Sequence, residues 1–414
     1  MKHGFHYFPD TLHYRQHDLM IWLPRLQALG ARWLVLQAPL QRAIPEGFIS
    51  ALLAAKIQPV LQFQLQPGSF PIEEDLPLLF KTYWRWGVRY ATLFDQPNAH
   101  RAWRSAAWVQ TDLVERFLDL YLPLSHACLN AGLIPIFPPL KPGGDYWDTA
   151  FLRGALESIL RRGHQDLLDQ LVIGAYATPG NRPLQWGAGG PERWPNARPY
   201  YTPAGVEDQR GFRIFDWYAA ISEAVLCSPR PIFLFGMGYR ADEDEHIKKN
   251  LQIVRMLTGE FIRGLEPIPS QVIGGAFGPL TDLEIGSSTV PGWFRQDGEF
   301  NPQAETLRQW AGENLPASDG SASASASIRH YLLLPSYEWG ISDYHIDLIR
   351  PIIKKFQPTV GFSLAEAQNA RRVTVIGGEQ AFSEESLGSL RAAGILVERV
   401  SEDGTNIASL LTSS

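Results

Sequence analysis

Tyr90-Ala-Thr-Leu-Phe-Asp-Gln-Pro-Asn98 is a short apolar run that ends abruptly in polar residues. A second run of the same kind, Pro231–Phe235, passes directly into Gly236-Met-Gly-Tyr239. A buried parallel strand has this appearance, because both of its faces are covered and the chain turns polar only where the strand leaves the sheet. Both stretches therefore predict strands of a parallel sheet, each ending in residues that line the sheet's exposed edge.

The same pattern recurs through the first 315 residues, in alternation with segments of helical spacing. The strands are predicted at Gly4–Phe8, Ala31–Gln37, Gln58–Gln64, Tyr90–Phe94, Leu133–Phe137, Leu171–Tyr176, Pro231–Phe235 and Val272–Phe277. The helices between them include His17–Leu29, Phe48–Ala55, Thr111–Ala131, Phe151–Arg161, Phe212–Leu226 and His246–Leu257. Glycine follows several helices, as at Gly30 and Gly132, which fits a left-handed helix end. Eight strand–helix units predict an α/β fold, a (β/α)8 TIM barrel over residues 1–315.

A second, smaller domain is predicted after the barrel. Pro316–Ser327 consists mostly of serine and alanine and is typical of a flexible linker. Residues 328–414 then return to alternating strands and helices, which predicts a small three-layer α/β domain with a parallel sheet. Its strands are expected at His330–Leu334, Arg372–Ile376 and Ile395–Val400, and its helices at Tyr344–Phe356, Leu364–Arg371 and Glu384–Ala393.

Composition excludes several classes of function and location. The chain carries a formal net charge of −6 and shows no cluster of Lys and Arg, which argues against nucleic acid or an anionic membrane as partner. No apolar run approaches the roughly 18 residues of a membrane span, and the N-terminus has no signal-peptide pattern. The two cysteines, Cys128 and Cys227, fall in separate predicted helices, so no disulfide is expected. These features predict a cytoplasmic protein.

No cofactor or metal is expected either. The ten histidines do not show the spacing of a metal site, and no glycine-rich phosphate-binding motif followed by lysine occurs.

The two strand ends resemble those of retaining (β/α)8 glycoside hydrolases. The first is similar to the Asn-Glu-Pro-Asn strand end that carries their acid/base glutamate, and the second to the Thr-Glu-Gly-Gly-type end that carries their nucleophile. On this mapping Asp95 replaces the asparagine, Gln96 replaces the acid/base glutamate, Pro97 and Asn98 are unchanged, and Gly236 or Met237 occupies the nucleophile position.

The mapping leaves the barrel without the pair of groups that cleaves the sugar bond. Retaining hydrolysis needs two carboxyl groups about 5 Å apart. A glutamine amide such as that of Gln96 keeps the shape of glutamate but cannot deliver a proton, and glycine has no side chain to offer. The resemblance therefore implies a carbohydrate-directed protein, a pseudoenzyme that binds an oligo- or polysaccharide without standard retaining hydrolysis.

Candidate sugar-binding residues lie at the strand ends and in the long loop 177–209, which is rich in Pro, Gly, Trp and Tyr. Aromatic rings stack on sugar rings, and amides bind hydroxyl groups. Loop-stabilising hydrogen bonds are the competing role for the asparagines, and bonds to neighbouring strands for the glutamines. The expected stacking residues are Tyr176, Trp186, Trp194 and Tyr200, and the expected hydroxyl ligands are Gln37, Gln62, Gln96, Asn98 and Asn181.

Two alternative functions stay open. An active glycoside hydrolase could use relocated carboxylates, Asp95 with Asp10 or Asp145, although aspartates in such turns often cap helices instead. A carboxyl separation of roughly 6.5–9.5 Å would then indicate inversion. The other alternative is a non-catalytic scaffold that binds a protein partner through the C-terminal domain, where Tyr337, Trp339 and Tyr344 are the expected contacts.

Overall fold

The computed structural model describes residues 2–67, 75–240, 243–285, 288–314, 328, 330–335, 350, 353, 358–368, 370, 372–379, 381–392 and 395–400. The chain divides into two compact units, Met1–Pro316 and Ala317–Ser414. The predicted linker and the aromatic residues Tyr337, Trp339 and Tyr344 lie outside the described residues, as does nearly all of the predicted helix Tyr344–Phe356. Within the described residues, no helix is both long and apolar enough to cross a membrane.

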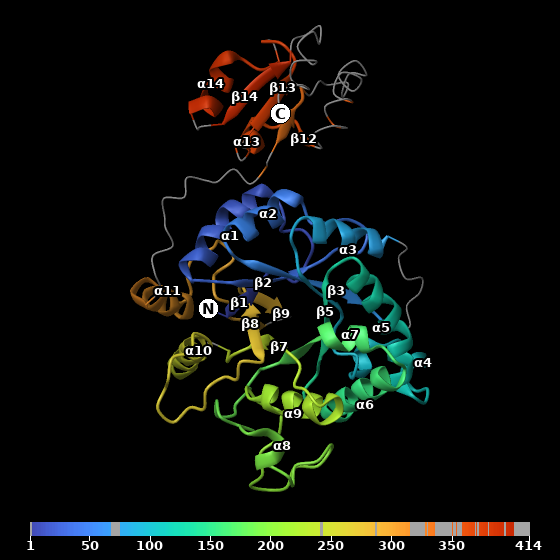
Figure 1. Cartoon of the computed structure of the whole chain (residues 1–414). Helices are drawn as coiled ribbons and strands as arrows, with labels where there is room; N and C mark the ends of the chain where they lie inside the picture. Colours follow the sequence, from blue (N-terminus) through green and yellow to red (C-terminus); the bar gives the residue numbers. More distant parts are fainter. Residues whose placement is uncertain are drawn as a thin grey trace. The chain divides into compact units, whose positions relative to one another are not determined.

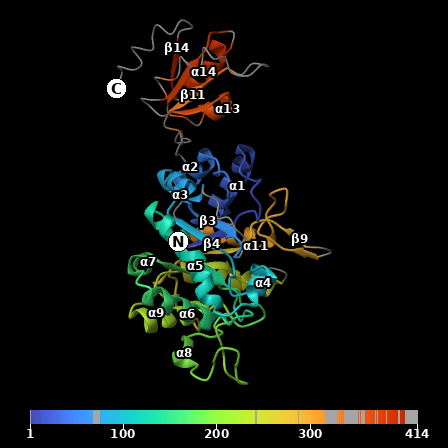
Figure 2. The same cartoon turned by 90° about the vertical axis from the view of Figure 1, so that its right-hand side faces the viewer.

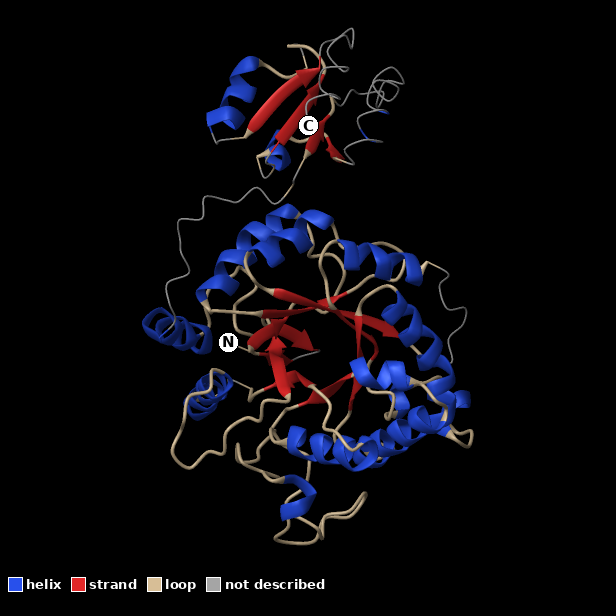
Figure 3. Cartoon of the chain, in the orientation of Figure 1, coloured by secondary structure: helices blue, strands red, loops and turns tan. Residues whose placement is uncertain are grey.

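Eight parallel strands close into a barrel in the first unit (Figure 3), as the sequence predicts. Each strand pairs with the next in the chain, and the first pairs with the eighth. The strands are β1 (His3–His6), β2 (Trp33–Gln37), β3 (Gln58–Leu65), β4 (Tyr90–Phe94), β5 (Ile134–Leu140), β6 (Val172–Tyr176), β7 (Ile232–Met237) and β8 (Val272–Pro279).

Helices surround the ring of strands (Figure 1). The predicted helix ends are present: Gly30 and Gly132 have φ angles of +66° and +94°, a conformation that glycine adopts at little cost. The helices are α1 (Gln16–Ala28), α2 (Glu46–Ala54), α3 (Leu76–Arg85), η1 (His100–Ala102), α4 (Ser105–Trp108), α5 (Leu113–Asn130), α6 (Asp148–Arg161), α7 (Gln165–Gln170), α8 (Gly190–Arg193), α9 (Ile214–Leu226), α10 (Asp244–Leu257) and α11 (Pro302–Asn314).

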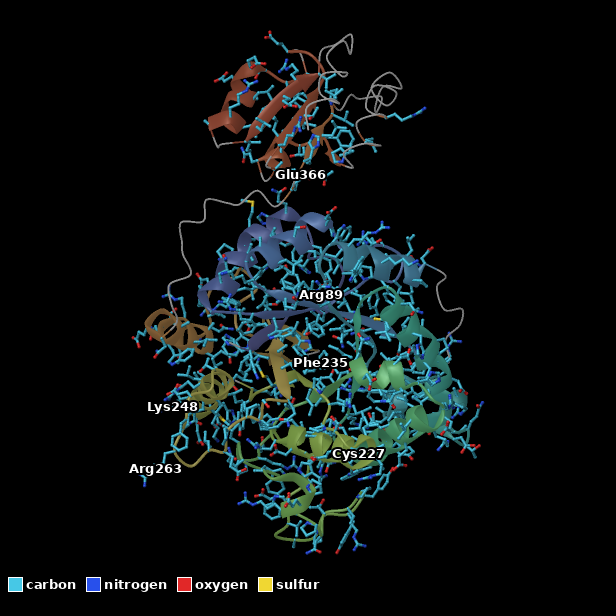
Figure 4. All side chains as sticks on the ribbon, viewed as in Figure 1. Arg89, Cys227, Phe235, Lys248, Arg263 and Glu366 are labelled. Atoms are coloured by element: carbon cyan, nitrogen blue, oxygen red, sulfur yellow. The ribbon has the colours of Figure 1, made fainter. Side chains whose placement is uncertain are left out.

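The inside of the barrel changes from apolar to polar along the strands. Side chains two apart on a strand share a face, so Trp33 and Val35 on β2 are followed on the same face by Gln37. On β3, Val60 is followed in the same way by Gln62. Phe235 of β7, labelled in Figure 4, belongs to the apolar cluster that fills the interior. The polar layer therefore lies at the carboxyl ends of the strands, where barrel enzymes and binding proteins place their sites.

The two ends of the barrel are distinguished in the side view of Figure 2. There α7, which precedes β6, lies at one end, and α4, which follows β4, lies at the other. A short antiparallel hairpin of β9 (Leu283–Ile285) and β10 (Ser288–Val290), which the sequence did not predict, follows β8 at the same end as α4.

The second unit contains a four-stranded parallel sheet in the order β12-β11-β13-β14. Its apolar core includes Leu333, Val373, Val375 and Leu387. The predicted small α/β domain with a parallel sheet is confirmed. Its elements are β11 (Tyr331–Leu333), β12 (Thr359–Gly361), α13 (Leu364–Ala367), β13 (Arg372–Ile376), α14 (Glu384–Ala392) and β14 (Leu396–Val400).

Candidate functional site

A pocket of about 260 Å³, which we call the mouth pocket, lies at the carboxyl ends of the barrel strands. Residues from or just beyond β1, β2, β3, β4, β6, β7 and β8 line it, and the apolar part of its lining includes Phe8, Val35 and Pro279. The polar side chains among the lining residues include His6, Gln37, Gln62, Gln64, Asp95 and Tyr176. A small concave site with an apolar floor and a few converging polar groups is typical of small-ligand binding.

Asp95 and Tyr176 form a hydrogen-bonded pair in the mouth pocket. The Tyr176 hydroxyl donates to Oδ1 of Asp95 over 2.7 Å. Burial raises the pKa of Asp95, and the hydrogen bond from Tyr176 and the charge of Arg101 offset only part of that rise. Burial and the adjacent carboxylate raise the pKa of Tyr176 as well, so its hydroxyl stays protonated and remains a donor.

His6 connects β1 to β7 across the pocket. Its Nε2 accepts a hydrogen bond from the backbone N–H of Gly236 at 3.2 Å. Burial lowers the pKa of His6 to about 4, so the ring is neutral at pH 7. Because Nε2 accepts, the neutral ring carries its proton on Nδ1. His6 thus offers a single N–H donor.

Gln62 lacks a hydrogen-bond partner for its side chain among the described residues, although only 6% of the residue is exposed. Its backbone carbonyl is used by Ala38, which shows that the strand pairing itself is satisfied. Its amide atoms are not enclosed by the protein and remain accessible from the mouth pocket. The Gln62 amide therefore leaves a donor and an acceptor open to the mouth pocket.

The position mapped to the nucleophile, Gly236, has no room for a larger residue. Its φ angle is +50°, in the left-handed region that favours glycine. A Cβ atom there would lie 3.2 Å from Cδ1 of Tyr176, tighter than an ordinary contact. The backbone carbonyl of Gly236 also accepts a hydrogen bond from Thr178 Oγ1 at 2.6 Å. The backbone conformation and the close approach of Tyr176 at this strand end both favour glycine over any residue with a side chain.

Two other residues of the quoted strand end, Gln96 and Asn98, do not line the mouth pocket. Gln96 has a φ angle of +48°, and its side-chain oxygen accepts a hydrogen bond from Arg101. Asn98 is fully buried, and its amide joins the loops after β4 and β5 by bonds of 2.8–2.9 Å to Lys141 and Tyr146. The loop-bracing role that competes with sugar binding is the one in which the structure places Asn98.

The aspartates considered as relocated carboxylates, Asp10 and Asp145, also lie outside the lining. Asp10 accepts hydrogen bonds from the Leu12 N–H and from His13 Nδ1, both at 2.8 Å, and so holds a surface turn. Asp145 is exposed and accepts the N–H of His100 at 2.8 Å, and this bond holds its pKa below the usual range. Asp95 is the one carboxylate among the described lining residues.

Two aromatic residues of the loop after β6 are hydrogen-bonded within that loop, and a third is bonded to the start of α6. Trp186 donates to Asp208 at 3.2 Å and Trp194 to the Ala188 carbonyl at 3.0 Å. Tyr200 is 60% exposed with a φ angle of +65°, and its hydroxyl accepts the Trp147 N–H at 2.9 Å. Asn181 is exposed and makes no hydrogen bond with the described residues. Of the predicted sugar ligands, the structure brings Gln37, Gln62 and Tyr176 together in the mouth pocket.

Two buried aspartates that no sequence pattern marks as functional, Asp148 and Asp208, hold the loops near this face. Asp148 accepts bonds from the Gly143 N–H, Gln209 and Tyr218 over 2.7–3.0 Å. Asp208 accepts from Thr202, Trp186 and Arg210, and although burial alone would raise its pKa, these donors lower it. A buried aspartate has no periodic pattern in the sequence that would identify it. The only available signal was for Asp148, which is the first residue of α6, a position where aspartate is common. Among the described residues, no group of three His, Cys, Asp or Glu is placed to hold a metal ion.

No family model and no curated protein sequence matches this chain. Solved structures that match it include β-glucuronidase 2 of Bacteroides uniformis, at 10% identity and a TM-score of 0.48, over 81% of this chain. The chain spans 37% of the length of that enzyme. A psychrophilic family 10 endo-β-1,4-xylanase matches at 9% identity and TM-score 0.41, over 74% of this chain and 96% of that one. AbfB, a family 51 α-L-arabinofuranosidase from Bifidobacterium longum, matches at 11% identity and TM-score 0.39, over 73% and 72%. At these scores we draw no functional conclusion from the likeness.

Proposed function

We propose that this protein binds a single sugar unit in the mouth pocket and does not cleave it by the retaining two-carboxylate route. The observation that carries the proposal is the amide of Gln62, which makes no hydrogen bond with the described residues and is open to a pocket at the strand ends. An amide side chain offers both a donor and an acceptor, which is what a sugar hydroxyl requires.

The rest of the lining supports the same ligand. Gln37 adds a second amide, His6 adds an N–H donor, and Asp95 adds an acceptor, around an apolar surface that suits the face of a sugar ring. The volume of about 260 Å³ fits one ring better than a chain of rings.

The strand ends support binding in place of retaining hydrolysis. Gln96 is bound to Arg101, and Gly236 carries no side chain, so neither position mapped from the retaining hydrolases supplies a carboxyl group. Asp10 and Asp145, the candidates for a relocated pair with Asp95, are engaged in turns outside the lining. Hydrolysis by two carboxyl groups needs both beside the same bond.

Isothermal titration calorimetry with a panel of monosaccharides and short oligosaccharides tests the proposal. We expect one or more monosaccharides to bind, and Gln62→Leu to weaken binding at least about tenfold, since each lost hydrogen bond to a buried group is worth about 1–3 kcal/mol. Gln309→Leu, which changes an exposed glutamine on α11, is the matched control and should bind like the parent. Failure of every sugar to bind, or an unchanged affinity in Gln62→Leu, would overturn the proposal.

A further inference from the structure

The mouth pocket has a one-sided charge. Asp95 is the only residue among its described lining that carries a formal charge at neutral pH, because no Lys or Arg lines it. His6 stays uncharged, since burial lowers its pKa to about 4. A ligand entering the pocket therefore meets one negative group and no cation in the lining.

The Asp95 carboxylate has an oxygen left for a ligand. Oδ1 accepts the Tyr176 hydroxyl at 2.7 Å, and no described residue donates a hydrogen bond to Oδ2. The positive charge of Arg101 acts on Asp95, but its guanidinium donates to Gln96 and Arg101 lies outside the lining. The lining therefore supplies no positive charge to Asp95, and Arg101 offsets only part of the effect of burial on its pKa.

We propose that the mouth pocket selects its sugar by charge: it accepts a neutral or amine-bearing ring and rejects a ring that carries a carboxylate. This rests on the proposed sugar-binding function. An ammonium group would form a charge-assisted hydrogen bond with Asp95, which is stronger than a bond between neutral groups. A uronic acid would lose water from its carboxylate, find no cation in the lining and be repelled by Asp95.

Calorimetry with matched sugars tests the charge rule on the full chain. The probes are the methyl glycosides of glucose, glucosamine and glucuronic acid, with the corresponding galactose set, at about pH 6.5, where a sugar amine is protonated. Within each set we expect the amine form to bind at least about tenfold more tightly than the uronate, with the neutral form between them. The advantage of the amine should shrink as salt is raised, because ions screen the attraction.

Asp95→Asn separates charge from shape. Asparagine keeps an oxygen for the Tyr176 hydroxyl but carries no charge, so we expect the affinities of the three forms to converge to within about threefold of one another. Asp169→Asn removes the same charge from an exposed site on α7 and should leave the order of affinities unchanged.

A uronate that binds as tightly as its neutral parent would overturn the charge rule while the sugar-binding function stands. Loss of all binding across both sets would instead overturn the sugar-binding function, and the charge rule with it.

Discussion

The effect of replacing Gln62 can show whether its amide serves ligand binding or the stability of the barrel. Its amide makes no hydrogen bond with the described residues and is open to the pocket, so replacing it with leucine breaks no bond inside the protein and adds apolar contact. We expect Gln62→Leu to raise the free energy of unfolding by about 1 kcal/mol, as measured by urea titration. A structural glutamine would show the opposite sign, since its removal would break bonds. The same variant should lose sugar affinity, so a stability gain paired with a binding loss identifies a functional residue.

Gly236, the position that the resemblance maps to the nucleophile, cannot take a carboxylate side chain without strain. A side chain there must adopt a φ of +50° and pack 3.2 Å from Tyr176. We expect Gly236→Glu to lower the free energy of unfolding by about 2–3 kcal/mol and to yield no hydrolysis of aryl glycosides.

Gly205→Glu provides the matched control, because Gly205 has a φ of +76° with no atom within 4 Å of a Cβ. It should cost only the backbone part, about 1–2 kcal/mol. If both variants lose the same free energy of unfolding, the contact with Tyr176 contributes nothing to the destabilisation of Gly236→Glu.

The buried ring of His6 makes stability depend on pH in a defined direction. Its pKa is about 4 in the folded protein, below the ordinary 6.5, because burial disfavours the charged ring. The unfolded chain therefore takes up a proton first as pH falls, so this contribution is complete above about pH 6.5 and is lost toward pH 4. Urea titrations at several values between pH 7 and pH 4.5 give the free energy of unfolding as a function of pH. The slope of that dependence should be smaller in His6→Leu than in the parent by about 1.4 kcal/mol per pH unit. Parallel slopes for parent and variant would contradict this.

At the scale of the elements, Asn98 ties the loops after β4 and β5 together. Its side chain makes three bonds of 2.8–2.9 Å, one accepted and two donated, in a fully buried position. We expect Asn98→Ala to lower the free energy of unfolding by about 3 kcal/mol, because partners on both loops lose their bonds inside the protein. Asn314→Ala, at an exposed end of α11, should change stability by less than about 0.5 kcal/mol. A small effect at Asn98 would mean that the loops hold their positions without it.

The sequence predicted the barrel elements well, and physical reasons account for what it missed. Each barrel strand is a run of apolar residues with an abrupt polar end, so all eight strands overlap their predicted ranges. The sequence missed the three-residue strands β9, β10 and β12, which lie in no longer apolar run and depend on tertiary pairing.

The mouth pocket was predictable only where strand alternation fixes the direction of a side chain. Gln37 and Gln62 continue the inward face of Trp33, Val35 and Val60, so they reach the pocket as that alternation requires. Gln96 lies beyond the regular strand, and its φ of +48° ends the alternation. The hydrogen bond between Asp95 and Tyr176 joins residues 81 apart in the chain, and no local pattern encodes it.

At the scale of the whole molecule, the two units have separate cores. The core of the barrel unit and that of the second unit share no residue. The mouth pocket is lined by residues between His6 and Leu283, all within Met1–Pro316. The core cluster of the barrel and the described lining of the pocket are both formed by residues of Met1–Pro316.

We therefore expect a chain truncated after Pro316 to fold and to keep its sugar affinity. Its stability can be followed by tryptophan fluorescence, because 12 of the 13 tryptophans, all except Trp339, belong to the barrel unit. The urea midpoint of this fluorescence change should agree with that of the full chain, and the dissociation constant for a bound monosaccharide should agree within about twofold. Gln62→Leu in the truncated chain should weaken binding by the same factor as in the full chain. A truncated barrel that folds but no longer binds would assign part of the site to the second unit. One that fails to fold would show that the barrel depends on the second unit for its stability.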